Sequence, residues 1–416
     1  MLLGGDAVAR LLLFASTVLT ARALGAEQFG VLVLVQTYAK ILGTVVNFQS
    51  WQAVIKFGAE ALAHHRQEDF KGIVWLGSVL DVASALLGTA TAFCVLQWVG
   101  RWLGWNEEII KMASFYSLVI LFNLTGTATG IIRLFEQFKL FATQRFLAGS
   151  LKLAGVLLAY LYGAGLWVYV LIWMVADALG YTLLVVFGYW LLQQKGIRKW
   201  WRYRTREWRP LLAFACWTNL SSTVDIPVQM LDVFIVSWLT SLEAVGVYKI
   251  FKQASDVLTK PVDPVYQVIY PQFVSLIAAA QEVRAVRMAL RVGILILLFA
   301  IPMVAVISLS SPWWLDFVFG PAFAREWVVF GVFLCLQGVS VTFTSLHPLF
   351  LALGYVKKDF EIALIANVAF LLIAWYLGRK FGLMGIVNAL GIQSVTVISL
   401  KMYFVYKRVH NTFRLA

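Results

Sequence analysis

The sequence predicts an all-α polytopic membrane protein with about twelve transmembrane helices in two six-helix bundles, related by a pseudo-twofold axis along the membrane normal. The first observation is composition: 61% of the residues are hydrophobic and 13% are charged, whereas soluble domains are about 45 to 50% apolar and about 25% charged. The second is a succession of apolar segments, and the third is an internal repeat. Lipid is therefore the solvent for most of this chain.

The apolar segments are found with windows of about 19 residues, and a hydrocarbon core of about 30 Å needs about 20 apolar residues per helix. The predicted helices of the first half are 5–24, 29–49, 73–98, 110–132, 147–164 and 167–192. Those of the second half are 211–238, 244–274, 289–310, 326–352, 360–378 and 383–406. No polar run between them exceeds about 25 residues, so any function must reside among the helices.

The N-terminal segment resembles a secretory signal peptide that ends in Ala21-Arg22-Ala23. It lacks the cationic region that begins such peptides, and many further apolar segments follow it. We therefore interpret residues 5–24 as the first transmembrane helix.

Lysine and arginine residues are distributed unevenly between the two sets of loops. One set carries Arg10, Lys56, Arg66, Lys71, Arg133, Lys139, Arg145, Lys152, Lys195, Arg198, Lys199, Arg202, Arg204, Arg206, Arg209, Arg284, Arg287, Arg291, Lys357, Lys358, Lys401, Lys407, Arg408 and Arg414. The other set carries Arg22, Arg101, Lys111, Arg325, Arg379 and Lys380. The positive-inside rule then predicts that both termini lie in the cytoplasm.

The densest basic run, at residues 194–210, divides the chain almost at its centre. It separates an N-terminal bundle, 1–193, from a C-terminal bundle, 211–416, and Trp200, Trp201, Tyr203 and Trp208 are interleaved with its cations. We expect a cytoplasmic linker that lies on anionic lipid headgroups, with its aromatic rings at the interface. A recruitment site for a cytoplasmic partner is the alternative. Nucleic acid is not an expected partner, because the basic residues lie in short loops rather than on a soluble face.

The internal repeat appears when the halves are shifted by about 216 residues. Glu27–Val31 then falls on Glu243–Val247 with the pattern E-x-x-G-V, and Gly165–Leu166 falls on Gly382–Leu383. The same shift of about 216 residues aligns the residues at both ends of each half. Six helices per half give both halves the same orientation, and such parallel repeats are typical of transporters.

Charged residues form a stripe within the predicted helix 244–274. Spacings of three and four residues place them on one helical face over about 21 Å: Lys249, Lys252, Asp256, Lys260 and Asp263. The preceding helix carries a second stripe of polar residues: Thr218, Ser222, Asp225, Gln229 and Asp232. The repeat superimposes Lys40 of helix 29–49 on Asp256.

A charge at mid-bilayer costs about 2.5 to 3.5 kcal/mol, so these side chains must face each other or water. Either they pair and hold the helices together, or they line a hydrated cavity that attracts an anionic headgroup. The candidate substrate-binding residues are Lys40, Lys249, Lys252 and Lys260. The candidate ion-coupling or charge-pairing residues are Asp225, Asp232, Asp256 and Asp263. Pro261 and Pro264 lie beside the stripe and are expected to bend the helix.

Three other polar residues lie within apolar segments: Asp81, Asp177 and His347. For each, hydrogen bonding is favoured over a role in proton transfer or titration. The sequence has no CxxC motif and no histidines at ligand spacing, so we expect no metal site and no cofactor. Catalytic residues are not expected either.

Several segments together resemble the polysaccharide transporter (Wzx-type O-antigen flippase) family of the multidrug, oligosaccharidyl-lipid and polysaccharide (MOP) exporter superfamily. The stretches LGAEQFGVLVLV, LTSLEAVGVYKIFKQASDVL and LDFVFGPAFAREW are examples. The marks of the resemblance are Gly25, Glu27, Gly30, Asp232, Glu243, Gly246, Tyr248, Pro271, Gly320, Pro321, Gly354, Gly382 and Gly385. Most are turn glycines and helix-junction residues, so they indicate fold better than substrate.

The resemblance implies a protein of the bacterial inner membrane that is not an enzyme and has a cationic central cavity. Its substrate would be an undecaprenyl-diphosphate-linked oligosaccharide, such as an O-antigen, capsule or exopolysaccharide repeat unit, moved to the outer leaflet by alternating access. The expected partners are this substrate, membrane lipids, a coupling proton or sodium ion, and a neighbouring glycan polymerase or glycosyltransferase.

Two other functions remain open. A cation-coupled multidrug exporter of the same superfamily would favour acidic residues for cationic drugs, whereas the stripe here is rich in lysine. A membrane enzyme of glycan assembly would need a sizeable outer loop, and the longest outer segment has only about 15 residues.

Overall fold

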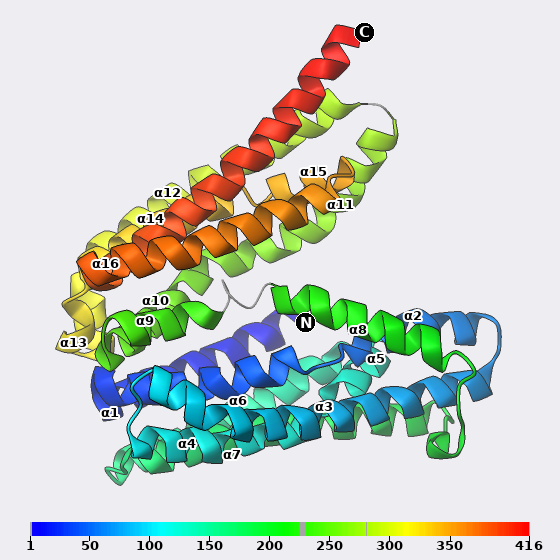
Figure 1. The fold of residues 1–416 in the computed structure, drawn as a ribbon, viewed down its shortest axis with the longest axis horizontal. Helices are drawn as coiled ribbons and strands as arrows, with labels where there is room; N and C mark the ends of the chain where they lie inside the picture. The colour runs from blue at the N-terminus through cyan, green and yellow to red at the C-terminus, as the bar shows by residue number, and fades with distance from the viewer. Residues whose placement is uncertain (1, 225–229, 280, 416) are drawn as a thin grey trace. The chain divides into compact units, whose positions relative to one another are not determined.

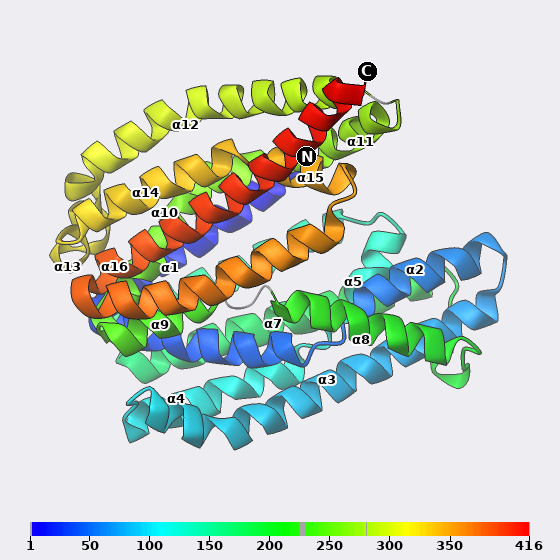
Figure 2. The same cartoon turned by 45° about the horizontal axis from the view of Figure 1, so that its top comes forward.

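The computed structural model describes residues 2–224, 230–279 and 281–415, and every regular element in these ranges is helical. Residue contacts divide the chain into two compact units, Met1–Phe234 and Ile235–Ala416. Figures 1 and 2 show long helices packed side by side within each unit. The predicted class, an all-α polytopic membrane protein, is confirmed.

Six helices in the described ranges are long and apolar enough to cross a membrane, or seven when a pair bent by 40° is included. That pair, Glu107–Phe122 and Thr125–Leu134, corresponds to the predicted helix 110–132. Two of the six, Val8–Ala63 and Lys357–Arg408, each contain two predicted spans. The predicted helix 147–164 falls on the helix Lys139–Leu161, which carries charges, and 244–274 falls on helices that are interrupted. The predicted helix 211–238 includes residues outside the described ranges.

Glycine breaks the two longest helices. α1 spans Leu2–Val45 and is interrupted at Gly25, where φ is 70°. α16 spans Val356–Leu415 and is interrupted at Gly382, where φ is 56°. Positive φ is a conformation that glycine adopts without a Cβ penalty, so each glycine separates two predicted spans. The internal repeat is consistent with these junctions, because Gly165, the partner of Gly382, directly precedes the helix Leu166–Gln194.

Unit 1 has an apolar core in which buried side chains of several helices meet, among them Val54, Phe57, Phe70, Ile131 and Leu192. Its remaining helices are α2 (Ser50–Ala63), α3 (Gln67–Trp102), α4 (Glu107–Ser117), η1 (Leu118–Phe122), α5 (Thr125–Leu134), α6 (Lys139–Leu161), α7 (Leu166–Gln194), η2 (Trp200–Arg202) and α8 (Trp208–Val224). We predicted a loop after residue 49. This prediction is wrong in part, because the segment contains α2. Lys56 and Glu60 lower its mean hydropathy, while Ala53, Val54, Phe57 and Ala61 form a buried face.

The basic linker contacts α3 and α7 of unit 1, and its expected position on lipid headgroups stays a prediction. Trp200 stacks on Tyr189 of α7 with a centroid distance of 5.0 Å. The Arg204 guanidinium lies 3.4 Å from the ring centroid of Trp75 on α3. These ring and cation–π contacts give the interleaved aromatic and basic residues an intramolecular role.

A hydrogen bond also ties the end of the linker to the loop before α3. Arg66 donates to the Glu207 carboxylate over 3.1 Å. That bond raises the pKa of the Arg66 guanidinium. Arg66 also pairs with Glu60 at 3.3 Å and with Asp69 at 3.5 Å, so one arginine joins α2, α3 and the linker.

Helix α8, which we assigned to the C-terminal bundle, packs within unit 1. Phe214 contacts Phe57 of α2 with a centroid distance of 6.0 Å, and Lys56 lies 4.4 Å from the same Phe214 ring. The Asn219 side chain donates to the backbone carbonyl of Val45, at 3.1 Å, and to that of Asn47. The division of the chain into two six-helix bundles at residues 194–210 stays a prediction from the sequence.

The helices of unit 2 pack around buried aromatic side chains. Its elements are α9 (Asp232–Leu239, whose first turn belongs to unit 1), α10 (Leu242–Thr259), η4 (Lys260–Val262), α11 (Asp263–Ala278), α12 (Glu282–Phe319), α13 (Pro321–Ala324), α14 (Trp327–Thr342), α15 (Leu346–Ala352) and α16. The predicted helix 244–274 is interrupted by η4. Pro261 lies in that turn and Pro264 in the first turn of α11, as the expected bend requires.

Candidate functional site

Helix α10 has one packed face and one charged face. Its packed face contacts α14: the rings of Phe251 and Phe330 are 4.9 Å apart, and those of Tyr248 and Phe333 are 5.9 Å apart. Val245, Ile250 and Leu258 are also buried, and this apolar burial fixes the rotation of the helix.

The charged face of α10 carries the predicted stripe. Lys249 and Lys252 are half-buried, whereas Asp256 and Lys260 are exposed. The Lys252 ammonium lies 5.7 Å from the ring centroid of Tyr248. Within the described residues, no lysine or arginine nitrogen lies within 4.0 Å of the Asp256 carboxylate.

Of the four predicted carboxylates, the structure describes the side chains of Asp232 and Asp256. Asp232 is 1% exposed, and its carboxylate accepts a hydrogen bond of 2.9 Å from the backbone N–H of Val233. Asp225 lies outside the described residues, as does the side chain of Asp263. Their assignment to ion coupling or charge pairing therefore remains a prediction.

Unit 1 contains a buried polar cluster centred on Asp177 of α7. Tyr116 of α4 donates to its carboxylate over 2.7 Å, and Gln36 of α1 donates to the same oxygen over 3.1 Å. The other carboxylate oxygen lies 3.8 Å from the Lys152 ammonium of α6. Four helices therefore meet at one carboxylate among apolar segments.

Lys152 is held on its other side by an aromatic ring. Its ammonium lies 3.5 Å from the ring centroid of Trp173, and the indole N–H of Trp173 faces the Thr20 hydroxyl at 3.4 Å. Lys152 is 7% exposed. Ion pairing and the π face together offset much of the cost of burying this cation.

Lys40 lies one turn beyond Gln36 on α1, and its side chain is exposed. It interacts electrostatically with both Asp177 and Lys152. Lys40, one of the four predicted substrate-binding lysines, therefore borders the Asp177 cluster within unit 1. The cluster holds one carboxylate against two cations, so an added anion would find positive charge there.

Sequence reasoning missed Lys152 as a member of this cluster. We counted it among the loop cations, although it falls inside the predicted helix 147–164. In the structure α6 begins at Lys139, which places Lys152 more than three turns into the helix. The sequence feature that could have identified Lys152 is its position within an apolar helix, with the lone acid Asp177 in the next apolar helix.

Asp81 forms a second buried hydrogen-bonded site in unit 1. One carboxylate oxygen accepts from the backbone N–H of Thr127 at 2.7 Å, and the other accepts from the Ser50 hydroxyl. These contacts join α2, α3 and α5. Asp81 therefore has the hydrogen-bonding role that we favoured from the sequence.

His347 belongs to a charge cluster of unit 2. Its Nδ1 lies 3.3 Å from the Asp359 carboxylate and 3.0 Å from the Lys401 ammonium. Lys401 and Asp359 are 2.5 Å apart and mostly buried. Because α15 and both parts of α16 contribute one residue each, the cluster fastens these segments together. Within the described residues, no group of three His, Cys, Asp or Glu side chains is placed to hold a metal ion.

Comparison with known proteins identifies the family. Residues 1–277 match the family model described as polysaccharide biosynthesis protein. The chain belongs to this family. A curated relative, the inner membrane protein YghQ of Escherichia coli (strain K12), is 25% identical over 252 residues, which cover 60% of this chain and 71% of the relative.

Solved structures of membrane transporters share the fold. An inward-facing multidrug resistance MATE family transporter of the MOP superfamily superposes with a TM-score of 0.76, at 14% identity, over 97% of this chain and 96% of the other. The lipid II flippase MurJ, in an inward closed conformation, gives 0.73 at 14% identity over 97% and 87%. A MOP superfamily transporter from Pyrococcus furiosus gives 0.64 at 14% identity over 98% and 93%. The chain therefore has the fold of these transporters, and its long apolar helices make it a multi-pass membrane protein.

Proposed function

We propose that this chain is a flippase that moves an undecaprenyl-diphosphate-linked oligosaccharide from the cytoplasmic to the outer leaflet of a bacterial inner membrane by alternating access. The observation that carries the proposal is the placement of lysines on otherwise apolar helices. Lys249 and Lys252 occupy the face of α10 opposite its packed face, and Lys40 is exposed beside the Asp177 cluster.

These lysines suit a phosphorylated cargo. Diphosphate oxygens accept charge-assisted hydrogen bonds, and an ammonium in a region of low dielectric attracts them more strongly than it would in water. A diphosphate carries more negative charge than one carboxylate, so it would compete with Asp177 for Lys152. Binding would then replace Asp177 as the partner of Lys152, while the Asp177 carboxylate would keep its hydrogen bonds from Tyr116 and Gln36.

The transport cycle needs no covalent chemistry from the protein. In this proposal Lys40, Lys249, Lys252 and Lys260 bind the diphosphate, while Asp225, Asp232, Asp256 and Asp263 restore neutrality after release or bind a coupling proton or sodium ion. Both termini lie in the cytoplasm, as the distribution of lysine and arginine indicates. A glycan polymerase or glycosyltransferase would act on the same lipid-linked cargo.

The second candidate is a cation-coupled multidrug exporter, and the TM-score of 0.76 against a MATE transporter favours it. A cationic drug would need an available carboxylate. Asp177 is already paired with Lys152 at 3.8 Å, and the exposed Asp256 lies on a helix face with Lys249, Lys252 and Lys260, which would repel such a drug. The charge of the site therefore supports an anionic cargo.

The flippase proposal is tested by replacing two lysines of α10. We expect Lys249→Ala with Lys252→Ala to leave the protein folded and to reduce, by at least tenfold, the rate at which a lipid-linked oligosaccharide crosses reconstituted vesicle membranes. In cells, repeat units should accumulate on the inner leaflet.

The matched control is Arg379→Ala with Lys380→Ala, which removes the same charge from exposed positions elsewhere in unit 2. It should transport at the wild-type rate. Undiminished transport by the α10 variant would remove these lysines from the mechanism. Drug resistance conferred by the wild-type chain, without movement of lipid-linked sugar, would favour the exporter instead.

A further inference from the structure

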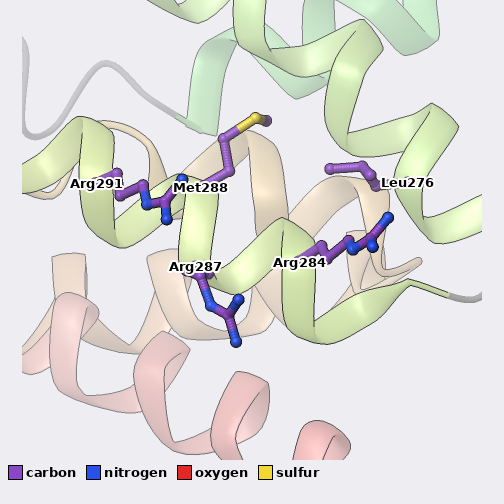
Figure 3. Close-up of a pocket in the computed structure, with 5 residues that line it drawn as sticks. All are labelled: Leu276, Arg284, Arg287, Met288 and Arg291. Carbon is purple, nitrogen blue, oxygen red and sulfur yellow. The ribbon is translucent and has the colours of Figure 1, made fainter.

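The first turns of α12 present three arginines to a cavity. Arg284, Arg287 and Arg291 follow each other at spacings of three and four residues, which places them on one side of the helix. With Leu276 of α11 and Met288 they line a cavity of about 300 Å³ (Figure 3). All three arginines are exposed.

Their positive charge is not neutralised within the chain. Arg284 donates to the side-chain oxygen of Gln281, a neutral group, over 2.9 Å. Among the described side chains, no carboxylate lies within 4.0 Å of any of these three guanidinium groups. The acid nearest in sequence, Glu282, pairs with Arg408 at 3.1 Å. The cavity is therefore an uncompensated cationic site.

On the C-terminal side of the arginines, the same face of α12 becomes apolar. Leu295, Leu298, Val306 and Leu309 continue the stripe, and they are 66%, 65%, 66% and 78% exposed. From Arg291 to Leu309 the helix rises about 27 Å, close to the thickness of a hydrocarbon core of about 30 Å. The whole stripe therefore spans the hydrocarbon core, and its part nearest the arginines matches one lipid, with charge at headgroup level and Leu295 and Leu298 at the level of the acyl chains.

We propose that this cavity binds the phosphate headgroup of an anionic phospholipid such as phosphatidylglycerol. Guanidinium groups bind phosphate oxygens in a bidentate geometry, and basic pockets at the cytoplasmic side of membrane helices bind anionic headgroups. The acyl chains lie along Leu295 and Leu298. The site is independent of the proposed flippase function, because it needs no cargo.

The apolar continuation favours a phospholipid over a soluble anion. Inorganic phosphate would contact only the arginines and gain nothing from the exposed stripe. The distribution of basic residues predicts that this end of α12 faces the cytoplasm, where the leaflet is anionic.

The test is native mass spectrometry of the full-length purified protein, titrated with phosphatidylglycerol and with zwitterionic phosphatidylcholine. Each arginine is expected to contribute about fivefold to the preference for the anionic lipid. The variant Arg284→Gln/Arg287→Gln/Arg291→Gln should therefore lose the preference by more than tenfold. The variant Arg284→Lys/Arg287→Lys/Arg291→Lys keeps the charge and should retain most of it.

The matched control is Arg325→Gln/Arg379→Gln/Lys380→Gln, which removes three exposed cations. Arg325 directly follows α13, which lies at the other end of α12 from its first turns (Figure 1), and Arg379 and Lys380 directly precede the break at Gly382. It should bind as the wild type does. Equal anionic preference in the glutamine variant and the wild type would overturn the proposal. So would displacement of phosphatidylglycerol by equimolar inorganic phosphate, or by undecaprenyl diphosphate, because each would assign the site to a different ligand.

Discussion

The Lys152–Asp177 pair shows how a single cation is accommodated among apolar helices. Removing one partner of a buried ion pair leaves an uncompensated charge, which costs about 3 to 5 kcal/mol. We therefore expect Asp177→Asn to lower the free energy of unfolding of unit 1 by about 3 kcal/mol. Thermal unfolding in detergent measures this, and the double variant Lys152→Met/Asp177→Asn should recover most of the loss.

The control for this pair is Lys111 with Glu107. Their charged atoms are also 3.8 Å apart, but both side chains are exposed, at 71% and 91%. Exposed pairs contribute little, so Glu107→Gln should leave the unfolding temperature unchanged. An Asp177→Asn protein as stable as the wild type would show that Trp173 and nearby water suffice to hold the Lys152 cation.

Individual site residues were only partly readable from the sequence. The spacing of Lys249, Lys252, Asp256 and Lys260 is local, so helical geometry alone predicted their shared face. The Asp177 cluster depends on contacts between four helices far apart in the sequence, and local spacing carries no information about such contacts. The sequence alone therefore predicted no partner for the Asp177 carboxylate.

At the scale of elements, hydropathy located the helices but not their breaks. The predicted pairs on either side of Gly25 and Gly382 were separated correctly, because glycine interrupts an otherwise apolar run. Helix α2 was missed, since Lys56 and Glu60 lower the mean hydropathy of a segment whose other face is buried. Window averages discard periodicity, which is the signal that an amphipathic helix carries.

The docking of the basic linker on α3 depends on a glycine. A Cβ atom on Gly72 would overlap the backbone of Arg204 and Thr205. We expect Gly72→Ala to displace the linker and to increase the rate of tryptic cleavage within residues 195–209 several-fold. Gel-based limited proteolysis of the purified protein measures that rate.

Gly43→Ala is the control for this substitution. A Cβ atom there would lie 3.8 Å from Ile120, which is ordinary van der Waals contact. Its cleavage rate should match that of the wild type. A Gly72→Ala protein with an equally protected linker would mean that the stacking of Trp200 on Tyr189 holds the segment without help from Arg204.

At the scale of the whole molecule, the duplicated sequence register and the MOP fold lead to one expectation about access. Membrane transporters of this architecture expose a site to one side at a time. The lysines proposed to bind cargo in unit 1 and unit 2 should then be reachable from both sides of the membrane during a cycle, although not simultaneously.

Cysteine labelling tests this expectation. Cys94, Cys216 and Cys335 are free and exposed, so they are first replaced by serine. We expect Lys40→Cys and Lys252→Cys to react with a membrane-impermeant maleimide in right-side-out and in inside-out vesicles. Lys380→Cys, an exposed position of the predicted outer side, should react only in right-side-out vesicles. Lipid-linked cargo should slow labelling of Lys40→Cys and Lys252→Cys but not of Lys380→Cys. Labelling of both lysine positions from a single side under every condition would contradict alternating access, because a fixed cavity cannot carry a diphosphate across the bilayer.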